Sequence, residues 1–94
     1  MLADSTRSWM RQRQTITAYA NGTRLFAYRA VRAKLDCNEL GLALDEIEAA
    51  AQLLANPPAA LPLERVVKIR ALSAEVGSEL RAECASRCAS GAKG

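Results

Sequence analysis

Two apolar stripes at helical spacing, separated by a pair of prolines, most constrain the fold of this chain. The first stripe has apolar side chains every three or four residues and predicts an amphipathic helix over residues 38–55, built on Leu40, Leu44, Ile47, Ala51 and Leu54. Asp36 and Glu39 match an acidic capping box at its start. Asn56-Pro57-Pro58 ends it, because the residue before a proline avoids the α conformation and proline cannot donate a hydrogen bond.

The second stripe predicts a longer helix over residues 62–88, with Pro62 at the first helical position. Its apolar side chains again recur every three or four residues: Leu63, Val66, Ile69, Leu72, Val76, Leu80, Cys84 and Cys88. A short proline-containing linker between two helices predicts an antiparallel helical hairpin. The larger side chains of the two stripes form the expected core or dimer surface, namely Leu40, Leu44, Ile47, Leu54, Val66, Ile69, Leu72, Val76 and Leu80.

The N-terminal third allows two interpretations. Apolar residues at helical spacing from Trp9 to Leu35, with cap candidates at residues 4–6, favour a helix over residues 4–35 that is broken near Gly22. Asn21-Gly22 between β-branched and aromatic residues is also a β-hairpin signal. A lone hairpin is marginally stable in water, so helix is the preferred interpretation. The predicted fold is all-α, with three helices in one small domain that spans residues 1–94 and a fraying tail after Ser90.

Composition leaves this domain a small core. Half of the 94 residues are hydrophobic, but alanine accounts for 19 of them, so few large apolar side chains remain. A chain of this size buries only about 60% of its extended surface on folding. We therefore expect a homodimer, in which a second copy covers the apolar stripes that one partner helix cannot cover.

The absence of histidine removes the commonest general base and metal ligand, and no nucleotide-binding or EF-hand motif is present. We therefore expect neither enzymatic activity nor a cofactor. The odd number of cysteines favours small core residues in a reducing cytoplasm. The alternatives are an intermolecular or redox-sensitive disulfide, or a three-thiolate metal site built from Cys37, Cys84 and Cys88. No signal peptide or membrane-spanning run is visible, and arginine with abundant alanine is typical of bacterial sequences.

Charge is distributed in blocks along the chain. The net charge is +6 over residues 1–34, −6 over residues 35–64 and +3 over residues 65–94. Opposite blocks in one small domain are expected to neutralise each other within a helix pair or across a dimer.

All four aromatic residues lie in the basic block, interleaved with arginines. Trp, Tyr and Arg are enriched at the energetic centres of protein interfaces, so this segment predicts a partner-binding surface made of Arg7, Trp9, Arg11, Arg13, Tyr19 and Arg24. Trp9 is the expected anchor. The sequence thus favours a small regulator or adaptor that captures another protein; the alternative is a basic nucleic-acid-binding protein.

Overall fold

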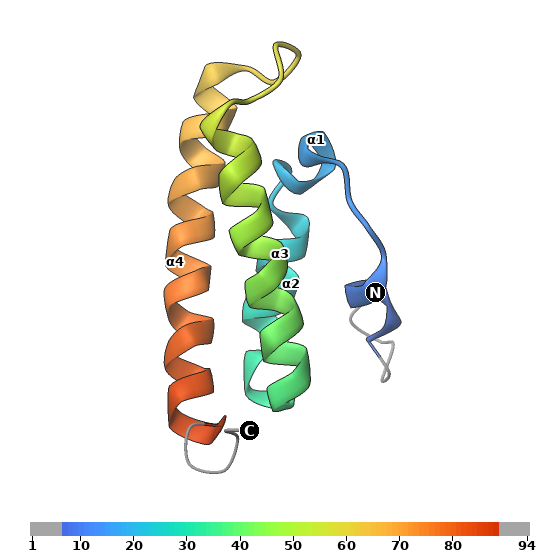
Figure 1. Cartoon of the computed structure of the whole chain (residues 1–94), viewed down its shortest axis with the longest axis vertical. Coiled ribbons are helices and arrows are strands. Elements are labelled where there is room, and N and C mark those ends of the chain that lie inside the picture. The colour runs from blue at the N-terminus through green and yellow to red at the C-terminus, as the bar shows by residue number, and fades with distance from the viewer. Residues whose placement is uncertain (1–6, 89–94) are drawn as a thin grey trace.

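The computed structural model describes residues 7–88, and every regular element among them is helical, so the predicted all-α class is confirmed (Figure 1). The predicted tail after Ser90 and the cap candidates at residues 4–6 lie outside the described residues. In chain order the elements are η1 (Ser8–Arg11), α1 (Ile16–Tyr19), α2 (Thr23–Val31), η2 (Arg32–Lys34), α3 (Cys37–Ala55) and α4 (Leu63–Cys88).

The two long helices begin and end within one residue of their predicted positions. At the start of α3 the Asp36 carboxylate accepts a hydrogen bond from the Glu39 backbone N–H (2.8 Å), and the Glu39 carboxylate accepts one from the Asp36 N–H (2.9 Å). This reciprocal pair is the predicted capping box. Helix α4 starts at Leu63, directly after Pro62, and the two helices run side by side (Figure 1).

The N-terminal third differs from the single broken helix that the sequence predicts. The 3₁₀ turn η1 is followed by extended backbone at Gln12, and α1 starts only after Thr15, whose hydroxyl accepts a hydrogen bond from the Ala18 N–H (3.1 Å). Gly22 then adopts φ 81° between α1 and α2, a left-handed conformation that glycine tolerates best. Asn21-Gly22 therefore separates two helices, and no hairpin forms in the described part of the chain.

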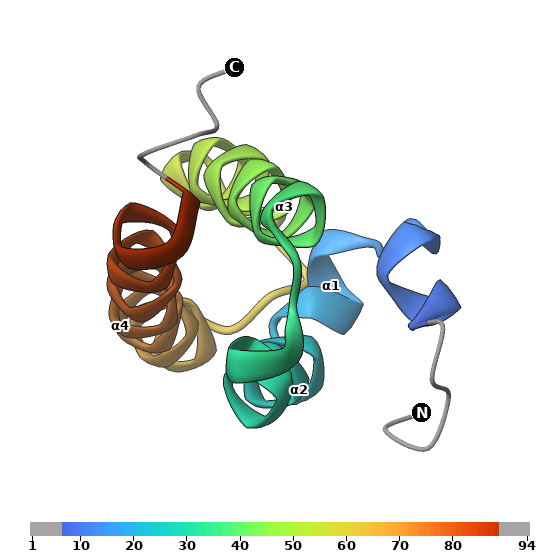
Figure 2. The ribbon, with the colours of Figure 1, turned by 90° about the horizontal axis from the view of Figure 1, so that it is seen from below.

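Helices α2, α3 and α4 surround a common core, with α1 and η1 beside them (Figure 2). Seven of the nine larger stripe residues are buried in the single chain, whereas Leu44 and Leu72 are partly buried. The predicted stripes are thus mainly the monomer's own core. The largest fully buried side chains are Tyr28, Leu25, Leu35, Leu40, Leu54, Leu80, Val66 and Val76.

A disulfide between Cys37 and Cys88 joins the first residue of α3 to the last residue of α4, at a sequence separation of 51. Cys84 is a free, partly buried thiol. This pairing corrects the expectation that all three cysteines are small core residues, and it leaves no set of three thiolates.

Candidate protein-binding groove

Arg29 of α2 and Arg32 of η2 are held by glutamates of α4. Arg29 donates to Glu79 through Nε (2.9 Å) and Nη2 (3.1 Å), and Arg32 donates to the same carboxylate (3.0 Å). Arg29 also forms a salt bridge with Glu75 (3.3 Å). Hydrogen bonds from Arg29 hold the pKa of Glu79 below its ordinary value. These guanidinium groups are therefore occupied in stabilising the packing of α2 on α4.

Arg24 lies in the interior, where its side chain is only 4% exposed. It donates to the Glu46 carboxylate (3.1 Å) and to the Gln12 carbonyl oxygen (2.8 Å). The Tyr28 hydroxyl donates to the same Glu46 carboxylate. Burial is the main cause that raises the pKa of Tyr28, so its hydroxyl stays protonated as a donor. Glu46 thus connects α3 to two side chains of α2.

Trp9 lies in the core instead of on the surface, and it is only 5% exposed. Its ring packs against Tyr28 with centroids 5.7 Å apart, and the Arg24 guanidinium stands over it at 5.6 Å. Tyr19 is also buried, and its hydroxyl lies 2.6 Å from the Ser73 hydroxyl. Trp9, Tyr19 and Arg24 are therefore not placed as the exposed partner-binding anchors that the sequence predicts.

The other predicted partner-binding residues are more accessible. Arg11 and Arg13 are exposed. Arg7 is half-buried and donates to Glu39 through Nε (3.0 Å) and Nη2 (2.8 Å), which lowers the pKa of Glu39. The pairs of Arg7 with Glu39 and of Arg24 with Glu46 join the basic block to the acidic block within one chain, as the charge pattern predicts. The six residues therefore do not form one surface.

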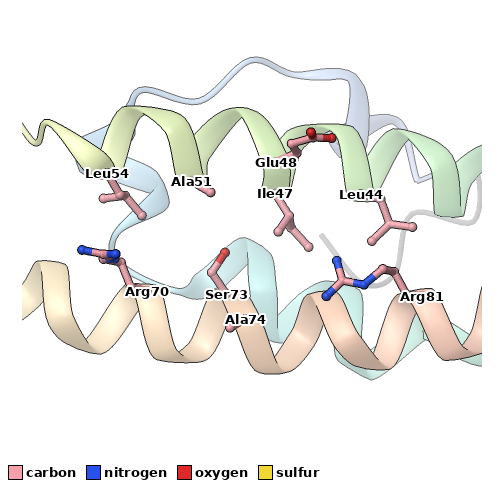
Figure 3. Close-up of a pocket in the computed structure, with 9 residues that line it drawn as sticks. All are labelled: Leu44, Ile47, Glu48, Ala51, Leu54, Arg70, Ser73, Ala74 and Arg81. Atoms are coloured by element: carbon pink, nitrogen blue, oxygen red, sulfur yellow. The ribbon is translucent and has the colours of Figure 1, made fainter.

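A groove runs between α3 and α4 and encloses a cavity of about 620 Å³ (Figure 3). Leu44 and Ile47 point from α3 toward α4, and Arg81 points from α4 toward α3 (Figure 3). Among residues 7–88, those that line the groove come from these two helices: Leu44, Ile47, Glu48, Ala51 and Leu54 from α3, and Arg70, Ser73, Ala74 and Arg81 from α4.

Two exposed arginines mark the ends of this groove on α4. Arg70 and Arg81 are 11 residues apart, which corresponds to about 16 Å along a helix. Within residues 7–88 neither guanidinium forms a hydrogen bond or a salt bridge, in contrast to the arginines of α2. Glu48 lines the α3 side and likewise has no salt bridge in the described part of the chain. The groove therefore presents charges that the monomer does not neutralise.

The apolar surface of α4 continues beyond the groove. Leu63 is 75% exposed and Val67 is 60% exposed, and both share the helix face of Arg70 and Ala74 because these positions are three or four residues apart. Exposed apolar surface next to a groove is typical of protein-interaction sites. Small side chains, Ala51 and Ala74, line its middle and would allow another helix to approach closely.

The described residues offer little for other kinds of site. They contain no group of three or more potential metal ligands. None of the helices they form has an apolar segment long enough to cross a bilayer. A second hollow of about 350 Å³ lies near Gly22 and is lined by Arg65, Lys68 and Leu72, among others. Arg65 donates to the Asn21 side chain (3.1 Å), and Lys68 pairs with Glu64 (3.7 Å).

Comparison of this chain with known protein families, curated protein sequences and solved structures found no match.

The sequence prediction missed the groove and both of its arginines. Arg70, Ala74 and Arg81 share one helix face, a spacing that is readable from the sequence. That spacing does not reveal whether a carboxylate lies opposite them, because this depends on how α3 and α4 are rotated against each other.

Proposed function

We propose that this chain is a non-enzymatic protein-binding module, a regulator or adaptor that binds a helical segment in the α3–α4 groove. The observation that carries the proposal is the open apolar groove, about 620 Å³ in volume, bordered by two arginines that have no charged partner among residues 7–88. Helices commonly bind in such grooves through apolar side chains spaced three and four residues apart.

The charge pattern supports a protein partner over nucleic acid. Arg24, Arg29 and Arg32 of the basic block are engaged with glutamates and are not free to bind phosphates. Acidic residues of α3, Asp45 and Glu48, lie exposed on the same small domain and would repel a polyanion.

The test is a pull-down from lysate of the source cell, with and without nuclease treatment, using the tagged chain and two variants. Ala74→Phe places a large side chain in the groove, whereas Ala82→Phe adds the same side chain at an exposed position of α4 outside it. We expect a stoichiometric protein partner with the unmodified chain and with Ala82→Phe, and its loss with Ala74→Phe. Equal recovery with both variants, or a partner that nuclease removes, would contradict the proposal.

A further inference from the structure

The groove has one acidic and one basic side, and we propose that its occupant is α3 of a second copy of this chain. The two copies then form a symmetric dimer whose centre is a bundle of two α3 and two α4 helices. This inference rests on the proposed function, because it names the partner of the same groove.

The charges on the two sides are opposite, and they have no ionic partner in the part of the chain that the structure describes. On the α3 side, Glu48 lines the groove and Asp45 is exposed one turn before it. On the α4 side, Arg70 and Arg81 line the groove. No salt bridge within residues 7–88 involves any of these four residues. A surface that carries both signs can complement itself when a two-fold axis brings its two sides together.

A two-fold axis along the groove achieves this match. This axis places α3 of each copy over α4 of the other. Each α3 residue then faces the α4 residues of the other copy that lie at the same position along the groove. Ile47 of α3 and Gly77 of α4 lie at the same position along the groove, because a Cβ built on Gly77 would lie 3.5 Å from Ile47 Cγ2. Arg81 lies one turn further along α4, about 6 Å. Its long side chain can then reach the Glu48 and Asp45 carboxylates of the second copy.

Arg70 meets a different group in the same arrangement. Leu54 lines the groove beside Arg70 (Figure 3), and α3 ends one residue later at Ala55. The α3 helix of the second copy therefore ends above Arg70. The last carbonyl groups of a helix carry partial negative charge and are stabilised by a nearby cation. Both groove arginines thus gain electrostatic partners from the second copy.

The apolar lining fits close helix packing. Ala51 and Ala74 have short side chains, so a second pair of helices can approach and fill the hollow between α3 and α4. Leu44, which is only partly buried in the monomer, would be covered. Covering this face also adds apolar burial to a chain with few large hydrophobic side chains.

The experiment is a charge exchange between two variants, followed by analytical ultracentrifugation at several micromolar concentrations. We expect the unmodified chain to dimerise. Glu48→Arg and Arg81→Glu should each raise the dimer dissociation constant by roughly tenfold, because two symmetry-related contacts become repulsive. An equimolar mixture of the two variants should restore dimerisation, since both symmetry-related contacts pair opposite charges again in the mixed dimer. Lys34→Glu changes an exposed charge outside the groove and should leave the dimer unchanged.

Circular dichroism of each variant checks that the helices remain folded. This is expected because neither Glu48 nor Arg81 forms an ion pair with any described residue of its own chain. A chain that stays monomeric at every concentration, or a mixture that fails to restore the dimer, overturns the inference. If the chain is monomeric but the pull-down still recovers a partner that Ala74→Phe removes, the proposed function stands and only the identity of the partner is wrong. If the chain is monomeric and no recovered protein depends on the groove, both proposals fail.

Discussion

The two sides of α4 use charge differently. Toward α2, the carboxylates of Glu75, Glu79 and Glu83 bind Arg29 and Arg32 within the chain. Toward the groove, Arg70 and Arg81 have no charged partner among the described residues. Arginines of one chain can thus serve two purposes: those that face carboxylates hold α2 in place, and those beside the groove remain available to another molecule.

We expect the disulfide between α3 and α4 to contribute more to the free energy of unfolding than any single contact of α2 does. The Cys37–Cys88 disulfide, at a sequence separation of 51, restricts the conformations of the unfolded chain. Removing this restriction lowers the free energy of unfolding by about 4 kcal/mol. We expect reduction, or Cys88→Ser, to lower the free energy of unfolding by about that amount in urea titrations.

Cys84→Ser is the matched control, because Cys84 is a free thiol on the same helix. A loss as large with Cys84→Ser would show that the effect arises from packing near the end of α4 and not from the disulfide.

The contrast between paired and unpaired charges on α3 can be tested with two glutamates. Glu46→Ala should cost about 3 kcal/mol of unfolding free energy, because it removes the carboxylate that pairs with the buried Arg24 guanidinium and accepts a hydrogen bond from the Tyr28 hydroxyl. Glu48→Ala removes an exposed carboxylate without a salt bridge and should change the monomer's stability by less than about 0.5 kcal/mol. Both values follow from urea unfolding at concentrations that keep the chain monomeric. If both variants lowered the free energy of unfolding equally, the ion pair of Glu46 with Arg24 would not contribute to the monomer's stability as we expect.

A smaller effect is expected from pH. Arg7 and Arg29 hold the pKa of Glu39 and of Glu79, respectively, below the ordinary value of 4.5. A carboxylate whose pKa is lower in the folded state stabilises the fold above its unfolded pKa, and this stability is lost as the pH falls through the folded-state pKa. Stability should therefore decline as the pH drops below 4.5, and less steeply in Glu39→Gln. An unchanged pH profile in that variant would contradict the assignment to Glu39.

Sequence alone predicted the two long helices because their signals are local. The capping box of Asp36 and Glu39, the Asn56-Pro57-Pro58 stop and the regular apolar spacing all act within a few residues. They fixed the bounds of α3 and α4 to within one residue. The N-terminal third has weaker local signals, since periodicity from Trp9 to Ile16 continues through a stretch that the structure shows as extended at Gln12.

The candidate site was harder to predict because it depends on contacts between distant segments. Trp9 beside arginines resembles an interface anchor, but its partners Tyr28 and Arg24 lie within the same chain. Cys37 and Cys88 are distant in sequence and meet only because α3 and α4 pack as an antiparallel pair. Whether a given arginine is paired depends on that same packing, which sequence spacing does not specify.

The burial of Trp9 has a practical consequence for following this molecule in solution. Trp9 is the chain's only tryptophan, so its fluorescence reports on a single place, the contact of the N-terminal segment with α2. Tyr28, with its ring centroid 5.7 Å away, is close enough to transfer excitation energy to it. Detachment of the segment around η1 would expose the indole to water and separate it from this donor. Emission from this one residue can therefore distinguish loosening of the N-terminal segment from unfolding of the helical hairpin, which circular dichroism records.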